Sequence, residues 1–390
     1  MRIGIVLSNH SEKSETFFRL KIDALNKTGK KIIIFSDKNH IINNIHFVKN
    51  PILHKKSFIR IIRICIDILT IMILKPTITF KFLRLEKLDQ ISFLNRWVNL
   101  YLNSKILRYE LDWLHFGFLT LALRRENVAR AIGAQMAVSL RGYDINTVPL
   151  RDKNIYGPLW NKIDKVHSIS KYLIIKANLL NPDYQKPYKI IYPAIDLETF
   201  KYIGDRKHFP KKRTINILTV SRLNWIKGLE STVEAMGLLN LTSIDFHYFI
   251  VGSGGDKERI LFACDSLGIL PKVTIHENID HNNVYTHYSN SDLYIQYSHE
   301  EGFCNSVLEA QATGIPCVVS NSSGLKENII NDETGWVVQK NKPTLLAGKI
   351  EEILEMSQEE ILKIKSNARH RVESKFNFDY QARLFDRFYD

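Results

Sequence analysis

The sequence has few cysteines, and none of them forms a short paired motif. Cys65, Cys264, Cys304 and Cys317 are scattered over 390 residues, and no Cys-x-x-Cys occurs. This spacing argues against a zinc site and against a disulfide framework, and it is typical of a protein in a reducing compartment. The cysteine content therefore predicts a cytoplasmic protein.

The chain also lacks two motifs that place phosphates or divalent cations. No Asp-x-Asp pair occurs, although such a pair would bring a divalent cation onto a diphosphate. The glycine turn at residues 252–255 has Lys257 where a dinucleotide-binding fingerprint would have its third glycine. We therefore expect no metal and no dinucleotide-dependent dehydrogenase, and we expect Gly252 to form a tight turn close to a ligand.

Long apolar runs are absent as well. The most apolar segment, residues 58–74, is interrupted by Arg60, Arg63 and Asp67, whereas a membrane span needs roughly 20 apolar residues. Two interpretations stay open for this segment. It is either a buried helix with a few surface charges or a basic amphipathic helix on a membrane surface.

Acidic residues are scarce in the first half only. Residues 1–200 contain 32 Lys and Arg against 16 Asp and Glu, a net charge of +16, whereas residues 201–390 contain 22 against 25, a net charge of −3. A basic lobe favours an anionic partner, such as a membrane surface, a phospholipid-linked substrate or a nucleic acid, although a basic face without a partner is the alternative. No known nucleic-acid-reading motif occurs, so we expect no nucleic-acid partner.

What the sequence does have is a repeated alternation of short apolar strands with helices. A length of 390 residues favours two domains, and the alternation predicts an α/β protein with two doubly wound parallel sheets. Helices are predicted at about 15–28 and across 57–106, and a polar linker at 201–213. Strands are predicted near residues 3–8, 31–36, 112–116, 135–140, 165–170, 188–192, 215–221, 246–251, 273–276, 293–297 and 316–320.

The most specific motif is the run from Glu301 to Glu309, which follows a predicted strand and enters a helix at residue 305. A glycine loop before a helix N-terminus offers free backbone N–H groups to an anion. Each carboxylate can accept two hydrogen bonds from the hydroxyls of a ribose or a hexose. In the alternative interpretation, Ser306 and Glu309 form a capping box and Glu309 only closes the helix.

Two cations follow the first strand of the second half. Arg222 and Lys227 lie in the loop after residues 215–221, where a diphosphate would bind in a mononucleotide-binding fold. Arginine can donate a fork of two hydrogen bonds to phosphate oxygens, and lysine adds a compact charge.

These motifs together resemble glycosyltransferase family 4, which comprises retaining enzymes of the GT-B fold. Glu301 to Glu309 is similar to the Glu-x7-Glu motif of that family, and residues 221–223 with 227–228 are similar to its phosphate-binding loop. Residues 14–17, 115–117, 141–144 and 193–196 resemble family motifs of the first lobe. Arg141 stands where many members have histidine, and Cys304 stands where a glycine is common, so the donor sugar stays undetermined.

The resemblance implies two Rossmann-like domains whose parallel sheets face each other across a cleft. Residues 1–200, completed by a C-terminal helix at about 375–390, would bind the acceptor, and residues 201–374 would bind a nucleotide sugar. Arg222 and Lys227 would hold the diphosphate, Glu309 the ribose, and Glu301 with the following amides the hexose, while His115 would face the sugar. The catalytic set is thus His115, Arg222, Lys227 and Glu301, and the donor-binding set is Arg222, Lys227, Gly252, Gly302, Phe303, Cys304, Asn305, Ser306 and Glu309.

The resulting expectation is a hexosyltransferase that uses a UDP- or GDP-type sugar without a cofactor or metal. Its acceptor would be a carbohydrate, in particular a lipid-linked bacterial surface glycan, and it would be cytoplasmic or peripheral on the inner face of the membrane. Two alternatives stay open: a GT-B enzyme of another class, such as an epimerase or a phosphorylase, and a non-catalytic basic binding module. For His115 the alternative is a hydrogen-bonded histidine at a strand end.

Overall fold

The computed structural model describes residues 1–7, 22, 25, 29–37, 46–51, 58–182, 186–204, 209 and 214–390. The motif at residues 14–17, most of the helix predicted at 15–28 and most of the linker predicted at 201–213 lie outside these residues.

The chain divides into two compact units. Unit 1 comprises Met1–Ile169, Leu173–Ile191 and Ala382–Asp390, and unit 2 comprises Ser170–Tyr172 and Tyr192–Gln381. The predicted boundary followed residue 200, whereas the structure divides the chain before Tyr192. The C-terminal segment that belongs to unit 1 begins at Ala382, later than the predicted residue 375.

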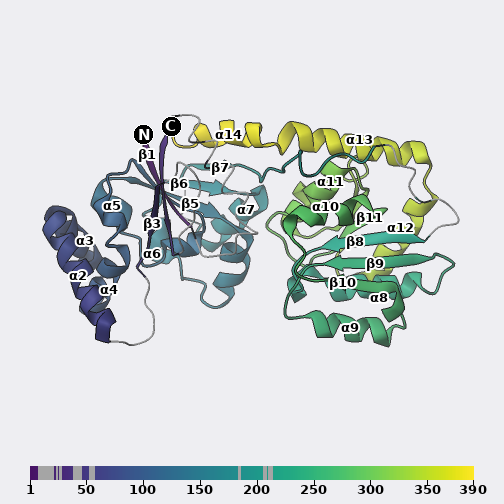
Figure 1. Ribbon diagram of the computed structural model, residues 1–390, viewed down its shortest axis with the longest axis horizontal. Coiled ribbons are helices and arrows are strands. Elements are labelled where there is room, and N and C mark those ends of the chain that lie inside the picture. The colour runs from purple at the N-terminus through teal and green to yellow at the C-terminus, as the bar shows by residue number, and fades with distance from the viewer. Residues whose placement is uncertain are drawn as a thin grey trace. The chain divides into compact units, whose positions relative to one another are not determined.

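Within the described residues, the sheet of unit 1 has seven parallel strands in the order β3-β2-β1-β4-β5-β6-β7 (Figure 1). On β1, an interior strand, Ile5 and its neighbour Val6 are both buried, as expected for a strand that is covered on both faces. The strands are β1 (Arg2–Val6), β2 (Lys31–Ser36), β3 (His46–Lys49), β4 (Trp113–Phe116), β5 (Gln135–Leu140), β6 (Lys165–Ser168) and β7 (Tyr188–Ile190).

The region predicted as helical at 57–106 consists of three helices that lie side by side, α2 (Phe58–Leu74), α3 (Pro76–Leu88) and α4 (Phe93–Asn103) (Figure 1). Pro76 separates the first two, because proline suits the first position of a helix and disfavours helical backbone in the residue before it. The other α-helices in the described residues before Tyr192 are α5 (Val128–Ile132), α6 (Gly157–Trp160) and α7 (Lys171–Leu180).

Helix α2 is amphipathic and is not enclosed by the unit. Ile71 is fully buried, whereas Ile62, Ile66, Leu69 and Ile73 are exposed at helical spacing along one face. The interpretation as a buried helix with a few surface charges is therefore wrong, because apolar side chains are exposed as well. No helix in the described part of the chain is both long and apolar enough to cross a bilayer.

The described sheet of unit 2 has six parallel strands in the order β10-β9-β8-β11-β12-β13. The sequence predicted β8 to β12 but missed β13, because a strand of three residues is too short to show a regular pattern of apolar residues. The strands are β8 (Ile215–Val220), β9 (Phe246–Val251), β10 (Val273–His276), β11 (Leu293–Gln296), β12 (Cys317–Ser320) and β13 (Trp336–Val338).

The strand order of unit 2 reverses at β8, which pairs with β9 on one side and β11 on the other. In open parallel sheets, ligands bind at the carboxyl ends of the strands beside such a reversal. The prediction of an α/β fold with two Rossmann-like parallel sheets is confirmed. The α-helices described after residue 214 are α8 (Leu229–Leu239), α9 (Lys257–Ser266), α10 (His281–Ser289), α11 (Asn305–Thr313), α12 (Pro343–Glu355), α13 (Gln358–Lys375) and α14 (Phe378–Asp386). The boundary between the units falls within α14.

Candidate functional site

The loops at the carboxyl ends of the unit 2 strands pack against one another through glycines. Gly252, after β9, has a left-handed φ of 146° and lies against the carbonyl of Ser221, after β8. Gly324, after β12, lies in the same way against the carbonyl of Gly302, after β11. A Cβ atom at Gly252 or Gly324 would collide with backbone, so only glycine allows these loops to come together. Gly252 therefore shapes the candidate site through its backbone.

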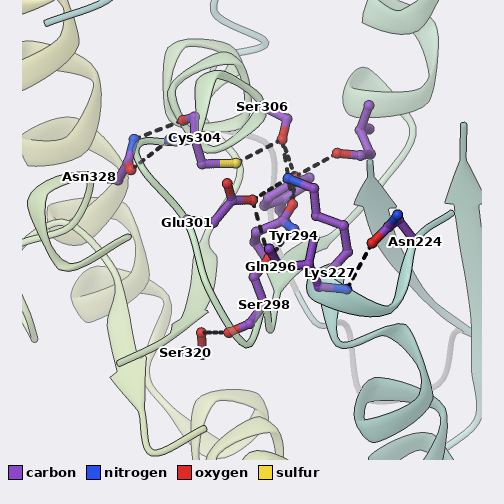
Figure 2. Close-up of polar contacts among 12 residues, drawn as sticks. Asn224, Lys227, Tyr294, Gln296, Ser298, Glu301, Cys304, Ser306, Ser320 and Asn328 are labelled. Atoms are coloured by element: carbon purple, nitrogen blue, oxygen red, sulfur yellow. Dashed lines mark hydrogen bonds and ion pairs between the residues drawn. The ribbon is translucent and has the colours of Figure 1, made fainter. Parts of the chain in front are cut away.

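Lys227 and Glu301, two residues of the predicted site, form an ion pair in this region (Figure 2). Glu301 also accepts a hydrogen bond from the Ser298 hydroxyl at 3.3 Å. Burial by itself would lower the pKa of Lys227, but the Glu301 carboxylate outweighs burial and the pKa is raised. The ammonium group therefore stays charged at neutral pH.

Arg222 supplies a second cation in the same loop. Its side chain is exposed, and it acts electrostatically on Lys227. Its guanidinium group forms no hydrogen bond or ion pair with the residues that the structure describes. The guanidinium group is therefore available to an anion at the carboxyl end of β8, beside the reversal of the strand order.

The capping-box interpretation of Ser306 and Glu309 is wrong. Helix α11 begins at Asn305 after Cys304, and no side chain caps its N-terminus. Ser306 therefore lies inside the helix, where its hydroxyl accepts a hydrogen bond from Tyr294 at 2.8 Å. Glu309 lies beyond the position from which a glutamate closes a capping box. The first turn of α11 thus offers backbone N–H groups without a side-chain cap.

Glu309 is half-buried and is oriented by a tyrosine. The Tyr288 hydroxyl donates a hydrogen bond to Glu309 Oε2 at 2.9 Å and approaches the Ser306 carbonyl at 3.2 Å. Burial, followed by the negative charge of Glu309, raises the pKa of Tyr288 well above its ordinary value. The phenol therefore keeps its proton and holds one carboxylate oxygen in place.

Cys304 and Phe303 have structural side chains. Asn328 clamps the backbone of Cys304, because it accepts from the amide at 3.1 Å and donates to the carbonyl at 2.8 Å. Burial, and then the charge of Glu301, raises the pKa of the Cys304 thiol to about 11. A thiol that stays protonated is a poor nucleophile. The Phe303 ring is buried and packs on Tyr192, with ring centroids 5.3 Å apart.

The structure contradicts the predicted role of His115. Its side chain is fully buried on β4, and its ring nitrogens lie 2.6 Å from the Tyr389 hydroxyl and 2.8 Å from the Ser139 hydroxyl. Both nitrogens are therefore satisfied inside unit 1, so that neither can reach a ligand in this arrangement. The alternative of a hydrogen-bonded histidine at a strand end describes it correctly.

Sequence analysis missed the residues that orient the site. Tyr288 and Tyr294 look like ordinary apolar positions in a helix and a strand, and only the fold brings their hydroxyls to Glu309 and Ser306. Asn328 is remote in sequence from Cys304, which it clamps. In the described part of the chain, no group of three or more His, Cys, Asp or Glu side chains is arranged to hold a metal ion.

The second half of the chain is similar to a known protein family. Residues 203–371 match the family described as Glycosyl transferases group 1. Over 165 residues the chain is 27% identical to the capsular polysaccharide biosynthesis glycosyltransferase CapM of Staphylococcus aureus. These residues make up 40% of this chain and 41% of CapM. The chain is also 25% identical over 289 residues to the amylovoran biosynthesis glycosyltransferase AmsK of Erwinia amylovora. These residues make up 70% of this chain and 68% of AmsK. The matched region thus spans about two fifths of CapM.

Solved structures resemble the whole chain. A sucrose-phosphate synthase from Thermosynechococcus elongatus superposes with a TM-score of 0.75 at 18% identity, covering 100% of this chain and 98% of the other. HepE of Anabaena, solved in complex with UDP-glucose, gives a TM-score of 0.70 at 13% identity and covers 99% and 98%. At these identities the likeness establishes the fold, which is GT-B.

Proposed function

We propose that this chain is a glycosyltransferase, because residues 203–371 match the group 1 family and the candidate site lies in that segment. The reaction would transfer a hexosyl unit from a nucleoside diphosphate sugar to a carbohydrate acceptor. One observation carries the proposal. Lys227, paired with Glu301, lies in the same loop as the unpartnered Arg222, at the strand ends where an α/β sheet binds nucleotides.

Arg222 and Lys227 would bind the diphosphate of the donor. Negative charge grows on the diphosphate as the bond to the sugar breaks, so that cations fixed beside it stabilise the transition state more than the ground state. Lys227 is held in place by Glu301 before any donor binds. Because the chain has no Asp-x-Asp motif, we infer that these two side chains neutralise the diphosphate without a metal.

Glu309 and the start of α11 would bind the sugar end of the nucleotide. The Glu309 carboxylate, whose Oε2 atom accepts a hydrogen bond from Tyr288, would also accept hydrogen bonds from the two hydroxyls of a ribose. Glu301 and the amides after Gly302 would contact the donor hexose. Gly302 lies against Gly324, which supports this role because a side chain at Gly324 would push the loop away.

The similarity of the motif from Glu301 to Glu309 to glycosyltransferase family 4 supports a retaining reaction. In that reaction the bond between sugar C1 and the diphosphate oxygen breaks, and the acceptor oxygen bonds to C1 on the same face. The acceptor proton passes to the leaving diphosphate. The chain then needs no side chain as an obligatory base, which is consistent with the burial of His115.

The acceptor would be a lipid-linked surface glycan. The name of CapM refers to capsular polysaccharide biosynthesis and that of AmsK to amylovoran biosynthesis. The net charge of +16 on residues 1–200 suits a phospholipid-linked acceptor.

Unit 1 would attach to an anionic membrane through the exposed face of α2. Ile66, Leu69 and Ile73 are 57%, 57% and 76% exposed, and Lys81 and Arg84 on the adjacent α3 are exposed as well. An apolar helix face beside basic residues is the pattern of a peripheral membrane helix. The protein would then act on the cytoplasmic face of the membrane.

A thermal-shift screen against UDP, GDP and their sugars tests the donor class, because a ligand that binds only the folded state raises the unfolding temperature. We expect a shift with one nucleotide family, both with and without a chelator. Product analysis with a labelled donor then separates transfer to an acceptor from epimerisation or phosphorolysis. The absence of a shift with any nucleotide would contradict the proposal.

A further inference from the structure

Unit 2 contains a cavity that lies apart from the residues that we assign to donor binding. It has a volume of about 240 Å³ and lies between the loop after β8 and the beginnings of α8 and α9. Arg222, Lys227, Glu301 and Glu309 do not line it. Its polar and aromatic lining consists of Asn224, Trp225, Glu230, Asp256, Arg259 and His299.

Trp225 forms an aromatic wall of this cavity. Its side chain is 57% exposed, although indole is among the largest apolar groups in proteins and gains from burial. It is the first residue of a short turn that is closed by Asn224, whose side chain accepts a hydrogen bond from the amide of Ile226. The turn therefore presents a flat apolar surface at the mouth of the cavity.

Asp256 is the second unusual residue. It occupies the N-cap position of α9, where aspartate normally accepts a hydrogen bond from the helix, but its side chain makes no capping bond. Its Oδ2 atom is buried and has no hydrogen-bond partner among the described residues. A buried carboxylate oxygen without a donor costs free energy, so its presence calls for an explanation.

The other carboxylate of the cavity is already satisfied. Glu230 forms an ion pair with Arg259, so that Asp256 alone among the lining carboxylates lacks a donor. A ligand that fits must therefore bring hydrogen-bond donors to Asp256 and an apolar face to Trp225. A sugar ring has both, since its hydroxyls project from the rim and its C–H groups form a face.

We propose that this cavity binds one sugar ring of a neutral glycan, with the ring stacked on Trp225 and a ring hydroxyl donating to the Asp256 carboxylate. The volume agrees with a single ring, because pockets for larger ligands measure roughly 300–1,000 Å³. This site rests on the proposed function for its role, which is to hold a distal sugar of the acceptor polymer. Its ligand chemistry follows from the cavity itself.

Saturation-transfer NMR with free glucose, galactose and N-acetylglucosamine tests the site on the full chain, with UDP or GDP at saturation. We expect at least one of these sugars to bind in the millimolar range while the nucleotide is present. Trp225→Ala and Asp256→Asn should each weaken that binding by about tenfold or more. Phe262→Ala and Glu258→Gln are matched controls, because both residues are exposed on α9 and neither lines the cavity.

The unfolding temperature and nucleotide affinity of each variant are measured in parallel, since Trp225 shares a loop with Arg222 and Lys227. Three results would overturn the proposal: no binding of any of the three sugars, equal binding by the cavity variants and the controls, or displacement of the sugar by nucleotide alone. The last result would place the cavity in the donor site. Sugar binding that persists in a protein without nucleotide affinity would contradict the proposed function and leave the glycan site standing.

Discussion

The motif residues of the two units have opposite surroundings. In unit 2, Arg222 is exposed and Glu309 is half-buried at the strand ends. In unit 1, His115 and Asp144 are fully buried, and Asp144 accepts hydrogen bonds from the amide and hydroxyl of Thr120. Polar motif residues thus stay accessible or half-buried at the strand ends of unit 2 and are enclosed in the core of unit 1, and burial is what separates them.

The largest effect that follows from this difference concerns the phosphate cations of unit 2. Arg222→Ala should reduce turnover by about 10²–10³ with little change in the donor Michaelis constant, because the lost interaction grows as the diphosphate leaves. Activity should survive a chelator. Steady-state kinetics measure both, with Lys349→Ala on the surface of α12 as the matched control. Near-native turnover of Arg222→Ala would show that the phosphate site is misplaced.

Lys227→Ala should lose activity to a similar extent but should also lose stability. Its removal leaves the Glu301 carboxylate in a mostly buried position without its partner, and breaking such a pair costs about 3–5 kcal/mol. Thermal unfolding of the two variants separates these effects. A Lys227→Ala protein as stable as the Arg222→Ala protein would contradict the observed ion pair.

Glu309 should show a smaller effect, confined to donor binding. Glu309→Gln should weaken donor affinity by about tenfold to a hundredfold, since charge-assisted hydrogen bonds are lost. Tyr288→Phe should weaken it less, because the carboxylate remains but is no longer held. Isothermal titration with the donor measures both, and Glu355→Gln, exposed at the end of α12, is the control. Unchanged affinity of Glu309→Gln would leave this residue without a ligand role.

His115 should affect stability and leave the donor site intact. His115→Phe removes both ring nitrogens from the hydroxyls of Tyr389 and Ser139. The Ser139 hydroxyl keeps its hydrogen bond with His167, whereas the Tyr389 hydroxyl loses its partner, and a buried polar group without a partner costs about 1–3 kcal/mol. Denaturant unfolding should show this loss, and donor affinity should equal that of the wild type. A variant that keeps its stability and loses turnover would restore the predicted catalytic role.

The smallest expected effect for a single residue is in membrane attachment through unit 1. The fraction of protein that sediments with anionic liposomes should fall at high salt. Each basic residue near the membrane surface contributes about 1 kcal/mol to binding, and salt screens this attraction. Ile66→Glu and Leu69→Glu on the exposed face of α2 should reduce it further, whereas Leu241→Glu, 83% exposed in unit 2, should not. Equal binding to neutral liposomes would contradict an electrostatic attachment.

The sequence was sufficient for the α/β fold, and it named two residues of unit 2, Lys227 and Glu301, that the structure brings together. Alternation of short apolar strands with helices predicted both sheets except for the short strands β3 and β13, because the pattern reflects burial on both faces of a parallel strand. Arg222, Lys227 and Glu301 follow predicted strands, and the carboxyl ends of parallel strands share one edge, so that their proximity followed from topology.

What the sequence could not supply was the burial and partners of single side chains. The pattern around Ser306 fits a capping box, but the helix begins at Asn305 because the preceding loop is clamped by Asn328. The burial of His115 depends on Tyr389 at the far end of the chain. Both errors come from contacts between residues remote in sequence, which local patterns do not encode.

Hydrogen–deuterium exchange with and without the nucleotide that gives a thermal shift tests the central claim most directly. That claim places the donor at the carboxyl ends of the unit 2 strands, against the loops that contain Arg222, Gly252 and Glu301. We predict slower exchange on nucleotide addition in residues 221–228, 252–256 and 298–309, where backbone amides would contact or surround the ligand. Unchanged exchange in all three segments, with protection elsewhere in the chain, would contradict the account.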